Sequence, residues 1–443
     1  MKPYVVIMGP VATRSGYGNH TRDLCTSLID SDKYEIDIIS LPWGNTPMDA
    51  LKADNEEHQR ISQHIAKQNI TRKPDVFIQV SVANEFQPHG KYNIGITAGV
   101  ETDQPPGEFI EGCNRMDLII ATSEYTKESL EKVSYDKLDK KTNQKIGDIR
   151  LTTPVEVLAE GADHSIYKKL KRAEIHESID AYLSKIPSSF NFLFVGHWLK
   201  GAPGHDRKDV AMMIKTFCET FKNKARQNKP GLILKTSHAT FSIMDRDEIF
   251  RKIQEITAPY GDKAPNIYLL HGDLTDEEMN SLYNHSKVKS MISFTKGEGF
   301  GRPLLEFTFS GKPVIASDHS GHKDFLRVSH MLPGELTKVH KSAADQFILE
   351  GSNWFTVNYQ YASKVLKDCV DNYKNYTKAA KEQFKISRKE FTRDVMADKL
   401  CTIVDKGIDS VPKEMPLQLP KLKKASNTDA PKLKLPKLKK AEV

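Results

Sequence analysis

The sequence predicts an α/β protein with two parallel-sheet domains, and three observations lead to this fold class. The chain of 443 residues is longer than one ordinary hydrophobic core requires. Short apolar segments alternate with helical patterns along most of it, as they do in doubly wound sheets. Residues 289–318 form a compact unit of strand, glycine-rich loop, short helix and strand, which implies neighbouring parallel strands.

The first predicted domain begins with a buried strand at residues 4–9, a loop at 10–18 and a helix at about 20–28. A dinucleotide-binding turn is one interpretation of this loop. However, its glycine spacing differs from GxGxxG, and the next strand, at 34–40, ends without an acidic residue that would bind a ribose. The pattern therefore argues against an NAD site.

Three more strands are predicted in the first domain, at residues 75–80, 94–99 and 116–121. Glu101 and Asp103 follow the second of these strands. At the end of a parallel strand, a carboxylate is suited to take the proton from a bound hydroxyl group. An exposed turn is the other interpretation of these two residues.

A polar, lysine-rich segment at residues 165–189 separates the first domain from the second. The strands of the second domain are predicted at residues 190–196, 232–235, 266–270, 290–294 and 314–316. Arg207 and Lys208 precede the helix that follows the first of these strands, and a solvated basic helix start is one interpretation of this pair. Further helices are predicted at 354–376 and 379–408.

The glycine-rich loop at residues 296–301 is the candidate ligand site of the second domain. Its glycines let a bound group approach the main chain closely, and the helix expected at 303–310 begins with a proline directly after it. The free N–H groups at such a helix start attract a phosphate. Glu298 and Glu306 flank the same place, and carboxylates accept hydrogen bonds from sugar hydroxyls.

These residues carry a resemblance to a known family. EGFGRPLLE at 298–306, followed by GKPVIAS, closely resembles the signature of the family-four retaining glycosyltransferases, also called group 1 glycosyltransferases. The resemblance covers about residues 1–408. It implies the GT-B fold, in which two Rossmann-like domains face a cleft, and a hexosyl or pentosyl transfer from a nucleotide diphosphate sugar to an acceptor hydroxyl with retained anomeric configuration.

The resemblance also implies roles for residues of the second domain. Glu298 matches the glutamate that contacts the transferred sugar, and Glu306 matches the one that binds the ribose. The intervening main chain would hold the diphosphate through the amides around three residues: Gly299, Phe300 and Gly301.

The remaining donor contacts implied by the family are cationic or lie in the first domain. Lys208 matches a lysine that neutralises the diphosphate, whereas His197 stands where the family has an arginine, a contact for which Arg207 is the substitute. The family's first glycine-rich loop touches donor phosphate or acceptor, and its counterparts are Gly16, Tyr17 and Gly18. Glu101 and Asp103 are the candidate acceptor-side bases.

No cofactor or metal is expected. The five cysteines are scattered without a CxxC pair, which argues against a zinc site or a disulfide framework. No DxD motif stands in a setting suited to divalent metal and diphosphate. A GT-B phosphorylase is another enzyme class, but the chain is short for one and has no lysine context that suggests pyridoxal phosphate.

The expected organisation is an acceptor-side domain at residues 1–175, a donor domain at 188–385, a helix at 386–410 that returns to the first domain, and a tail at 411–443. The tail has nine lysines against three acidic residues, a net +6 of the chain's +7, and it repeats Pro-Lys-Leu-Lys units. Such composition predicts a disordered segment that binds an anionic surface, either nucleic acid or an acidic membrane. A merely solubilising tail is the alternative.

The sequence has no apolar run of the roughly 20 residues needed to span a bilayer, and its start resembles a strand more than a signal peptide. A cytoplasmic location is therefore expected. Two other functions remain open. One is the same chemistry on a hydroxymethylated base of DNA, as in bacteriophage-type DNA glycosyltransferases. The other is a non-catalytic protein that binds a nucleotide sugar or a polyanion.

Overall fold

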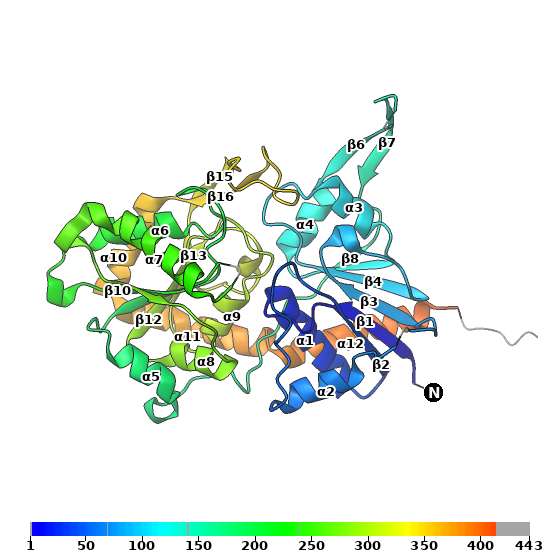
Figure 1. The fold of residues 1–443 in the computed structure, drawn as a ribbon, viewed down its shortest axis with the longest axis horizontal. Helices are drawn as coiled ribbons and strands as arrows, with labels where there is room; N and C mark the ends of the chain where they lie inside the picture. Colours follow the sequence, from blue (N-terminus) through cyan, green and yellow to red (C-terminus); the bar gives the residue numbers. More distant parts are fainter. Residues whose placement is uncertain (1, 69, 140, 239, 413–443) are drawn as a thin grey trace, which may run out of the picture. The chain divides into compact units, whose positions relative to one another are not determined.

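The structure is a computed structural model that describes residues 2–412, apart from 69, 140 and 239. The tail predicted at 411–443 therefore lies, but for its first two residues, outside the described residues. The described chain contains two six-stranded parallel sheets flanked by helices (Figure 1). The predicted α/β fold with two parallel-sheet domains is confirmed.

The first sheet has the strand order β2-β1-β3-β4-β5-β8. Its strands are β1 (Tyr4–Gly9), β2 (Glu35–Ser40), β3 (Val76–Val80), β4 (Tyr92–Thr97), β5 (Leu118–Ala121) and β8 (Val155–Val157). Its helices are α1 (Gly16–Asp30), α2 (Glu56–His64), α3 (Gly107–Cys113) and α4 (Glu124–Lys132). Val5 and Ile7 pack in one core with α1, whereas Tyr4 and Val6 pack on the opposite face. Because both faces of β1 are covered, this strand is continuously apolar.

The second sheet has the order β11-β10-β9-β12-β13-β14. Its strands are β9 (Asn191–Val195), β10 (Gly231–Lys235), β11 (Ile267–Leu270), β12 (Val288–Ser293), β13 (Val314–Ser317) and β14 (His330–Leu332). Its helices are α5 (Glu177–Ser184), α6 (Val210–Phe221), α7 (Ile243–Thr257), α8 (Asp276–Asn284), α9 (Arg302–Thr308), α10 (Tyr359–Asp371) and α11 (Tyr373–Glu390). Phe192 and Phe194 pack against α6, and Leu193 packs against α8 and α9 on the other face.

The helix expected at 354–376 is wrong at both ends, because α10 spans Tyr359–Asp371 and the next helix already begins at Tyr373. Trp354 and Phe355 lie in strand β16 (Asn353–Val357), which pairs antiparallel with β15 (Gly334–Lys338), and α10 begins only after Asn358. The Asn358 side chain accepts a hydrogen bond from Tyr361 N, so it is the cap that starts the helix. All five side chains at 353–357 are buried or half-buried, and the register Leu336–Phe355 and Thr337–Trp354 with β15 fixes them as a strand.

The single helix expected at 379–408 is two helices. Helix α11 ends at Glu390, and α12 (Arg393–Ser410) begins after Thr392, whose hydroxyl accepts a hydrogen bond from Val395 N. Helix α12 packs against α1, β3 and β4, so the chain returns to the first domain (Figure 1). Met396 and Leu400 join the core of the first sheet.

A hairpin of β6 (Ser134–Leu138) and β7 (Lys145–Arg150) projects from the first domain beyond α3 and α4 (Figure 1). The sequence patterns did not predict it, because its strands carry exposed polar side chains and no buried face. Within the described residues, no helix has the length and apolarity needed to cross a membrane.

Candidate active site

A cavity of about 500 Å³ opens where the carboxyl ends of the two parallel sheets meet. This is the edge at which open α/β sheets bind ligands. The first domain contributes Gly16, Tyr17, His20, Trp43 and Glu101 to its wall. The second domain contributes Arg207, Lys208, Lys235, Glu298, Phe300 and Glu306. The cavity therefore belongs to both domains.

Glu298 lies in the loop between β12 and α9 and is held by two cations. The Lys208 ammonium donates a hydrogen bond to Oε1, and Arg207 Nη1 lies 3.4 Å from Oε2. The same Nη1 lies 3.1 Å from Glu101 Oε1, so one guanidinium joins carboxylates of both domains. Burial would raise the pKa of Glu298, but Lys208 and Arg207 outweigh it and lower this pKa to about 2. Glu298 is an anion at neutral pH.

Glu306 lies on α9 in a different environment. Its Oε1 accepts a hydrogen bond from Arg302 Nε at 2.8 Å, and its Oε2 accepts one from the Tyr283 hydroxyl at 3.3 Å. Burial raises the pKa of Glu306 to about 7, with Arg302 opposing the shift and Asp276 adding to it. Both the ionised and the protonated carboxyl are therefore populated at neutral pH, and both form hydrogen bonds with hydroxyls.

The loop before α9 presents main-chain groups to the cavity. Gly301 has a φ of 94°, a left-handed conformation that favours glycine, and it caps α9. The N–H groups of Phe300 and Gly301 donate no hydrogen bond within the part of the chain that the structure describes. Two amide donors are thus available to a ligand beside the cationic pair, as the sequence predicts for a phosphate.

The same loop touches the first domain directly. The Ser123 hydroxyl donates a hydrogen bond of 2.6 Å to the carbonyl oxygen of Gly299. A Cβ atom at Gly297 would overlap the main chain of Glu101, and one at Gly299 would overlap the carbonyl of Ala98. Glycine is required at both positions because the two main chains approach so closely.

The structure brings together most residues of the predicted site. Gly16 and Tyr17 line the cavity, and the Tyr17 hydroxyl accepts a hydrogen bond from Ala98 N at 2.9 Å. Gly18 lies against the main chain at Thr13 and does not line the cavity. Glycine fits there because a side chain would collide with that turn.

Asp103 is not brought into the cavity. Its Oδ1 accepts a hydrogen bond from Asn353 N at 2.7 Å and its Oδ2 accepts one from Asn353 Nδ2 at 2.8 Å. It therefore fastens the first domain to β16. Among the described residues, no group of three or more histidine, cysteine or acidic side chains is arranged to hold a metal ion.

Residues 263–348, which include both Glu298 and Glu306, match the family model described as Glycosyl transferases group 1. The fold is similar to that of solved glycosyltransferases. A glycosyltransferase from Rickettsia africae matches with a TM-score of 0.61 at 12% identity, over 92% of this chain and 99% of that chain. The chain has the GT-B glycosyltransferase fold.

Two further structures are similar to this GT-B chain. Sucrose-phosphate synthase from Thermosynechococcus elongatus matches with a TM-score of 0.60 at 13% identity, over 91% of this chain and 99% of that chain. HepE from Anabaena, solved in complex with UDP and glucose, matches with a TM-score of 0.57 at 11% identity, over 91% and 100%. No curated protein matches the sequence.

The GT-B cleft also holds residues that the sequence did not single out. Lys235 ends β10, donates a hydrogen bond of 2.7 Å to the Gly272 carbonyl, and has its pKa lowered to about 8 by burial. Trp43 stacks on Tyr17 with ring centroids 4.3 Å apart. Lys235 could have been found from the sequence, because it is the last residue of a predicted strand and therefore lies at the ligand-binding edge of the sheet. No sequence pattern points to Trp43, since it lies in an irregular loop.

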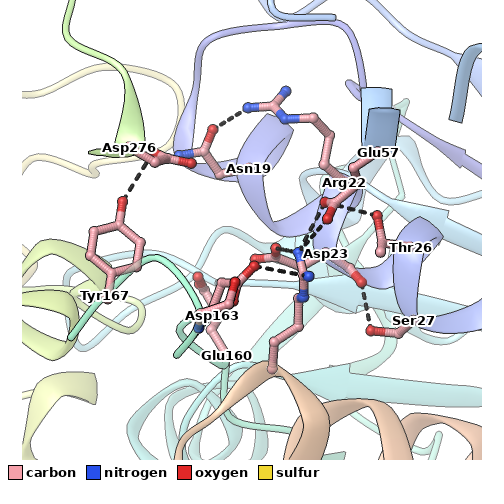
Figure 2. Close-up of polar contacts among 12 residues, drawn as sticks. Asn19, Arg22, Asp23, Thr26, Ser27, Glu57, Glu160, Asp163, Tyr167 and Asp276 are labelled. Carbon is pink, nitrogen blue, oxygen red and sulfur yellow. Dashed lines mark hydrogen bonds and ion pairs between the residues drawn. The ribbon is translucent and has the colours of Figure 1, made fainter. Parts of the chain in front are cut away.

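A network of buried and half-buried charges joins the two GT-B domains beside the cavity. Arg393 of α12 pairs with Glu57 and with Asp163, each at 2.9 Å. Figure 2 shows Asp23, Glu57 and Asp163 pointing toward one another. Asp23 also pairs with Arg302, which in turn binds Glu306. The helix that carries Glu306 is therefore tied electrostatically to α1 of the first domain.

Proposed function

We propose that the chain is a retaining glycosyltransferase that moves a sugar from a nucleoside diphosphate sugar to an acceptor hydroxyl. One observation carries this proposal. Two carboxylates, two cations and two free amides converge on a single cavity between the GT-B domains, at the spacing of the EGFGRPLLE signature. HepE from Anabaena, a structural neighbour, binds UDP and glucose in its crystal structure, which supports a nucleotide sugar as donor.

The proposed roles follow from the charge of each group. In the reaction, a bond forms between the acceptor oxygen and the anomeric carbon. The bond from that carbon to the diphosphate breaks with its electron pair going to the diphosphate oxygen, and the acceptor hydroxyl loses its proton. Lys208, Arg207 and the amides of Phe300 and Gly301 offset the charge that the diphosphate gains. Each charge-assisted contact contributes roughly 1.5–3 kcal/mol.

The carboxylates serve the hydroxyl-bearing parts of the donor. Glu298, held ionised, accepts hydrogen bonds from hydroxyls of the transferred sugar, and Glu306 binds the ribose. Glu101 faces the cavity and is the proposed acceptor-side base. Asp103 is not assigned a role in the reaction, because Asn353 engages both of its oxygens outside the cavity.

A panel of UDP-, GDP- and ADP-sugars, incubated with the purified protein and mixed hydroxyl acceptors, tests the proposal through nucleotide release. We expect release with one nucleotide class, and an NMR spectrum of the product with the donor's anomeric configuration. Binding of a nucleotide sugar without any release would instead identify the competing class, a non-catalytic binding protein.

We also propose that catalysis needs no divalent metal, since Lys208, Arg207 and the loop amides supply the positive charge that a metal would bring. EDTA is expected to leave the initial rate of nucleotide release unchanged. A rate that falls in EDTA and returns with magnesium or manganese contradicts this mechanism.

A further inference from the structure

His20 of α1 is a buried histidine without a partner. Its side chain is 3% exposed, and neither ring nitrogen has a hydrogen-bond partner among the described residues. Buried polar groups are almost always hydrogen-bonded, because leaving one unpaired costs stability. An imidazole that lines a ligand cavity in this state is a candidate binding group.

The imidazole is neutral. Burial lowers the pKa of His20 to about 3, and the charge of Arg302 lowers it further in the same direction. A neutral imidazole has one nitrogen that donates a hydrogen bond and one that accepts. A hydroxyl group is the ligand chemistry that matches either nitrogen, because a hydroxyl both donates and accepts. A phosphate oxygen matches only the donor.

The position of His20 on α1 sets which part of the cavity it reaches. His20 and Asp23 are three residues apart, so they lie on the same face of the helix. Asp23 pairs with Arg302, whose Nε lies 2.8 Å from Glu306 Oε1. His20 therefore faces the first turn of α9 from the opposite domain.

The polar neighbours of His20 on α1 are already engaged. The Tyr17 hydroxyl is bonded to Ala98 N and lies 3.1 Å from the Thr97 hydroxyl. The Asn19 side chain accepts a hydrogen bond from Arg22, as Figure 2 shows. Of these three cavity-lining side chains of α1, His20 alone keeps both of its polar atoms free.

We propose that His20 binds a hydroxyl group of the ligand in this cavity, so that the first domain takes part in recognising the sugar-bearing donor. The inference rests on the proposed function and deepens it. The hydroxyl comes from the ribose or from the transferred sugar, and both sources have the same chemistry. His20 acts by holding the donor against α9 and transfers no proton.

Calorimetric binding with His20→Leu tests this inference. The probes are UDP, GDP and ADP, followed by the glucose conjugate of whichever diphosphate the wild type binds. We expect the variant to bind about tenfold more weakly, the effect of one lost hydrogen bond. Its thermal midpoint should equal or exceed that of the wild type, because an apolar side chain replaces an unpaired polar one. If His20 had a purely structural role, His20→Leu would lower the thermal midpoint and leave the affinity unchanged.

The arms of the experiment distinguish the two hydroxyl sources. If His20→Leu already binds the nucleoside diphosphate about tenfold more weakly than the wild type, the hydroxyl belongs to the ribose. The two proteins should then bind the 2′-deoxy or the 3′-deoxy nucleotide with equal affinity. If the affinity of His20→Leu is lower only for the glucose conjugate, the hydroxyl belongs to the transferred sugar. His20→Gln, which keeps a donor and an acceptor, should recover part of the affinity, and it serves as the test variant if His20→Leu does not fold.

His330→Leu is the matched control. His330 lies on β14, does not line the cavity, and also has an unpaired nitrogen, Nε2. Its substitution should leave binding unchanged. Equal affinity of wild type and His20→Leu for both the diphosphate and its glucose conjugate overturns the inference alone. A wild type that binds none of the probes overturns the proposed function, and the inference falls with it.

Discussion

Glu298 is the residue on which the proposed chemistry depends most directly. Replacing it by alanine removes the group that holds the sugar hydroxyls and leaves Lys208 and Arg207 buried without this partner. We expect Glu298→Ala to lower kcat by at least about 100-fold, the size of effect seen when one preorganised polar group is removed. Glu306→Ala should act mainly on the KM for the donor, raising it about tenfold.

Steady-state rates of nucleotide release measure both effects. Glu335→Ala, in the exposed hairpin of β15, is the control and should leave both constants unchanged. Turnover of Glu298→Ala within threefold of the wild type would remove Glu298 from the site. In that case the resemblance of the loop to a donor-binding signature would reflect structure alone.

Glu160 gives a second prediction at this scale, on stability. Burial raises the pKa of Glu160 to about 7, and although Arg302 opposes the shift, Asp23 and Glu306 add to it. The folded state therefore binds a proton that the unfolded state has lost between pH 4.5 and 7. The unfolding free energy that this group contributes must fall as pH rises through that window, by up to about 3 kcal/mol.

Urea unfolding of wild type and Glu160→Gln at pH 5 and pH 8 measures this effect. The glutamine cannot ionise, so the stability of the wild type relative to Glu160→Gln should be lower at pH 8 than at pH 5. Glu128→Gln, on the exposed side of α4, is the control for the change of glutamate to glutamine itself. A relative stability of wild type and Glu160→Gln that is the same at both pH values contradicts the assignment.

At the residue scale, the sequence predicted those site residues whose position follows from a short motif. Glu298, Glu306 and Lys208 stand in short motifs whose spacing implies their place at a sheet edge, and all three line the cavity. Asp103 has an equally suggestive position in the sequence. Its contact with Asn353, 250 residues later, decides its placement, and no local pattern contains that pairing.

At the scale of the elements, the loop between β12 and α9 positions the site against the first domain. Gly299 is fixed by the Ser123 and Thr122 hydroxyls, which both donate to its carbonyl oxygen. Gly299→Ala would force its new methyl group into Ala98. We expect a loss of about 1–3 kcal/mol in the free energy of unfolding, as for other overpacked sites, together with a lower kcat.

Gly147→Ala is the matched control for this change. Gly147 lies in β7 and a Cβ there meets nothing within 4 Å, so the substitution should leave stability and rate unchanged. Chemical unfolding and nucleotide release measure the two effects. If Gly299→Ala matched Gly147→Ala in both, the close contact between the loop and the first domain would contribute neither to stability nor to the rate.

The elements were predictable where a periodic apolar pattern and a cap agreed. At the start of α8 the Thr275 hydroxyl and the Glu278 carboxylate form a capping box, a pattern that is contained in four consecutive residues. The pattern failed at Trp354, because apolar residues of a strand and of a buried helix look alike over a few positions. It also failed at Thr392, a cap inside an otherwise helical stretch. In both stretches the sequence does contain the residue that caps the helix, Asn358 before α10 and Thr392 before α12.

On the scale of the whole molecule, the charge of the chain is concentrated at its carboxyl end. The segment 411–443 carries a net +6, which leaves about +1 for the remaining residues. We propose that this segment brings the protein to an anionic acceptor or surface, separately from the proposed catalysis. Deleting residues 411–443 should then leave nucleotide release with a small acceptor intact and weaken binding to duplex DNA or to anionic vesicles.

Salt dependence and a matched variant decide what the segment contributes. If about six of its lysines contact phosphates of DNA, the logarithm of the binding constant should fall with the logarithm of salt concentration with a slope of about −5. A full-length variant with all nine lysines of this segment changed to glutamine keeps its length and leucines but removes its positive charge, so it should bind DNA as weakly as the truncated protein. Affinity for vesicles that survives this change but not the truncation would assign the contact to the leucines at a membrane. Equal binding of full-length and truncated protein to both probes at low salt leaves the segment only a solubilising role, because an electrostatic contact is strongest under that condition.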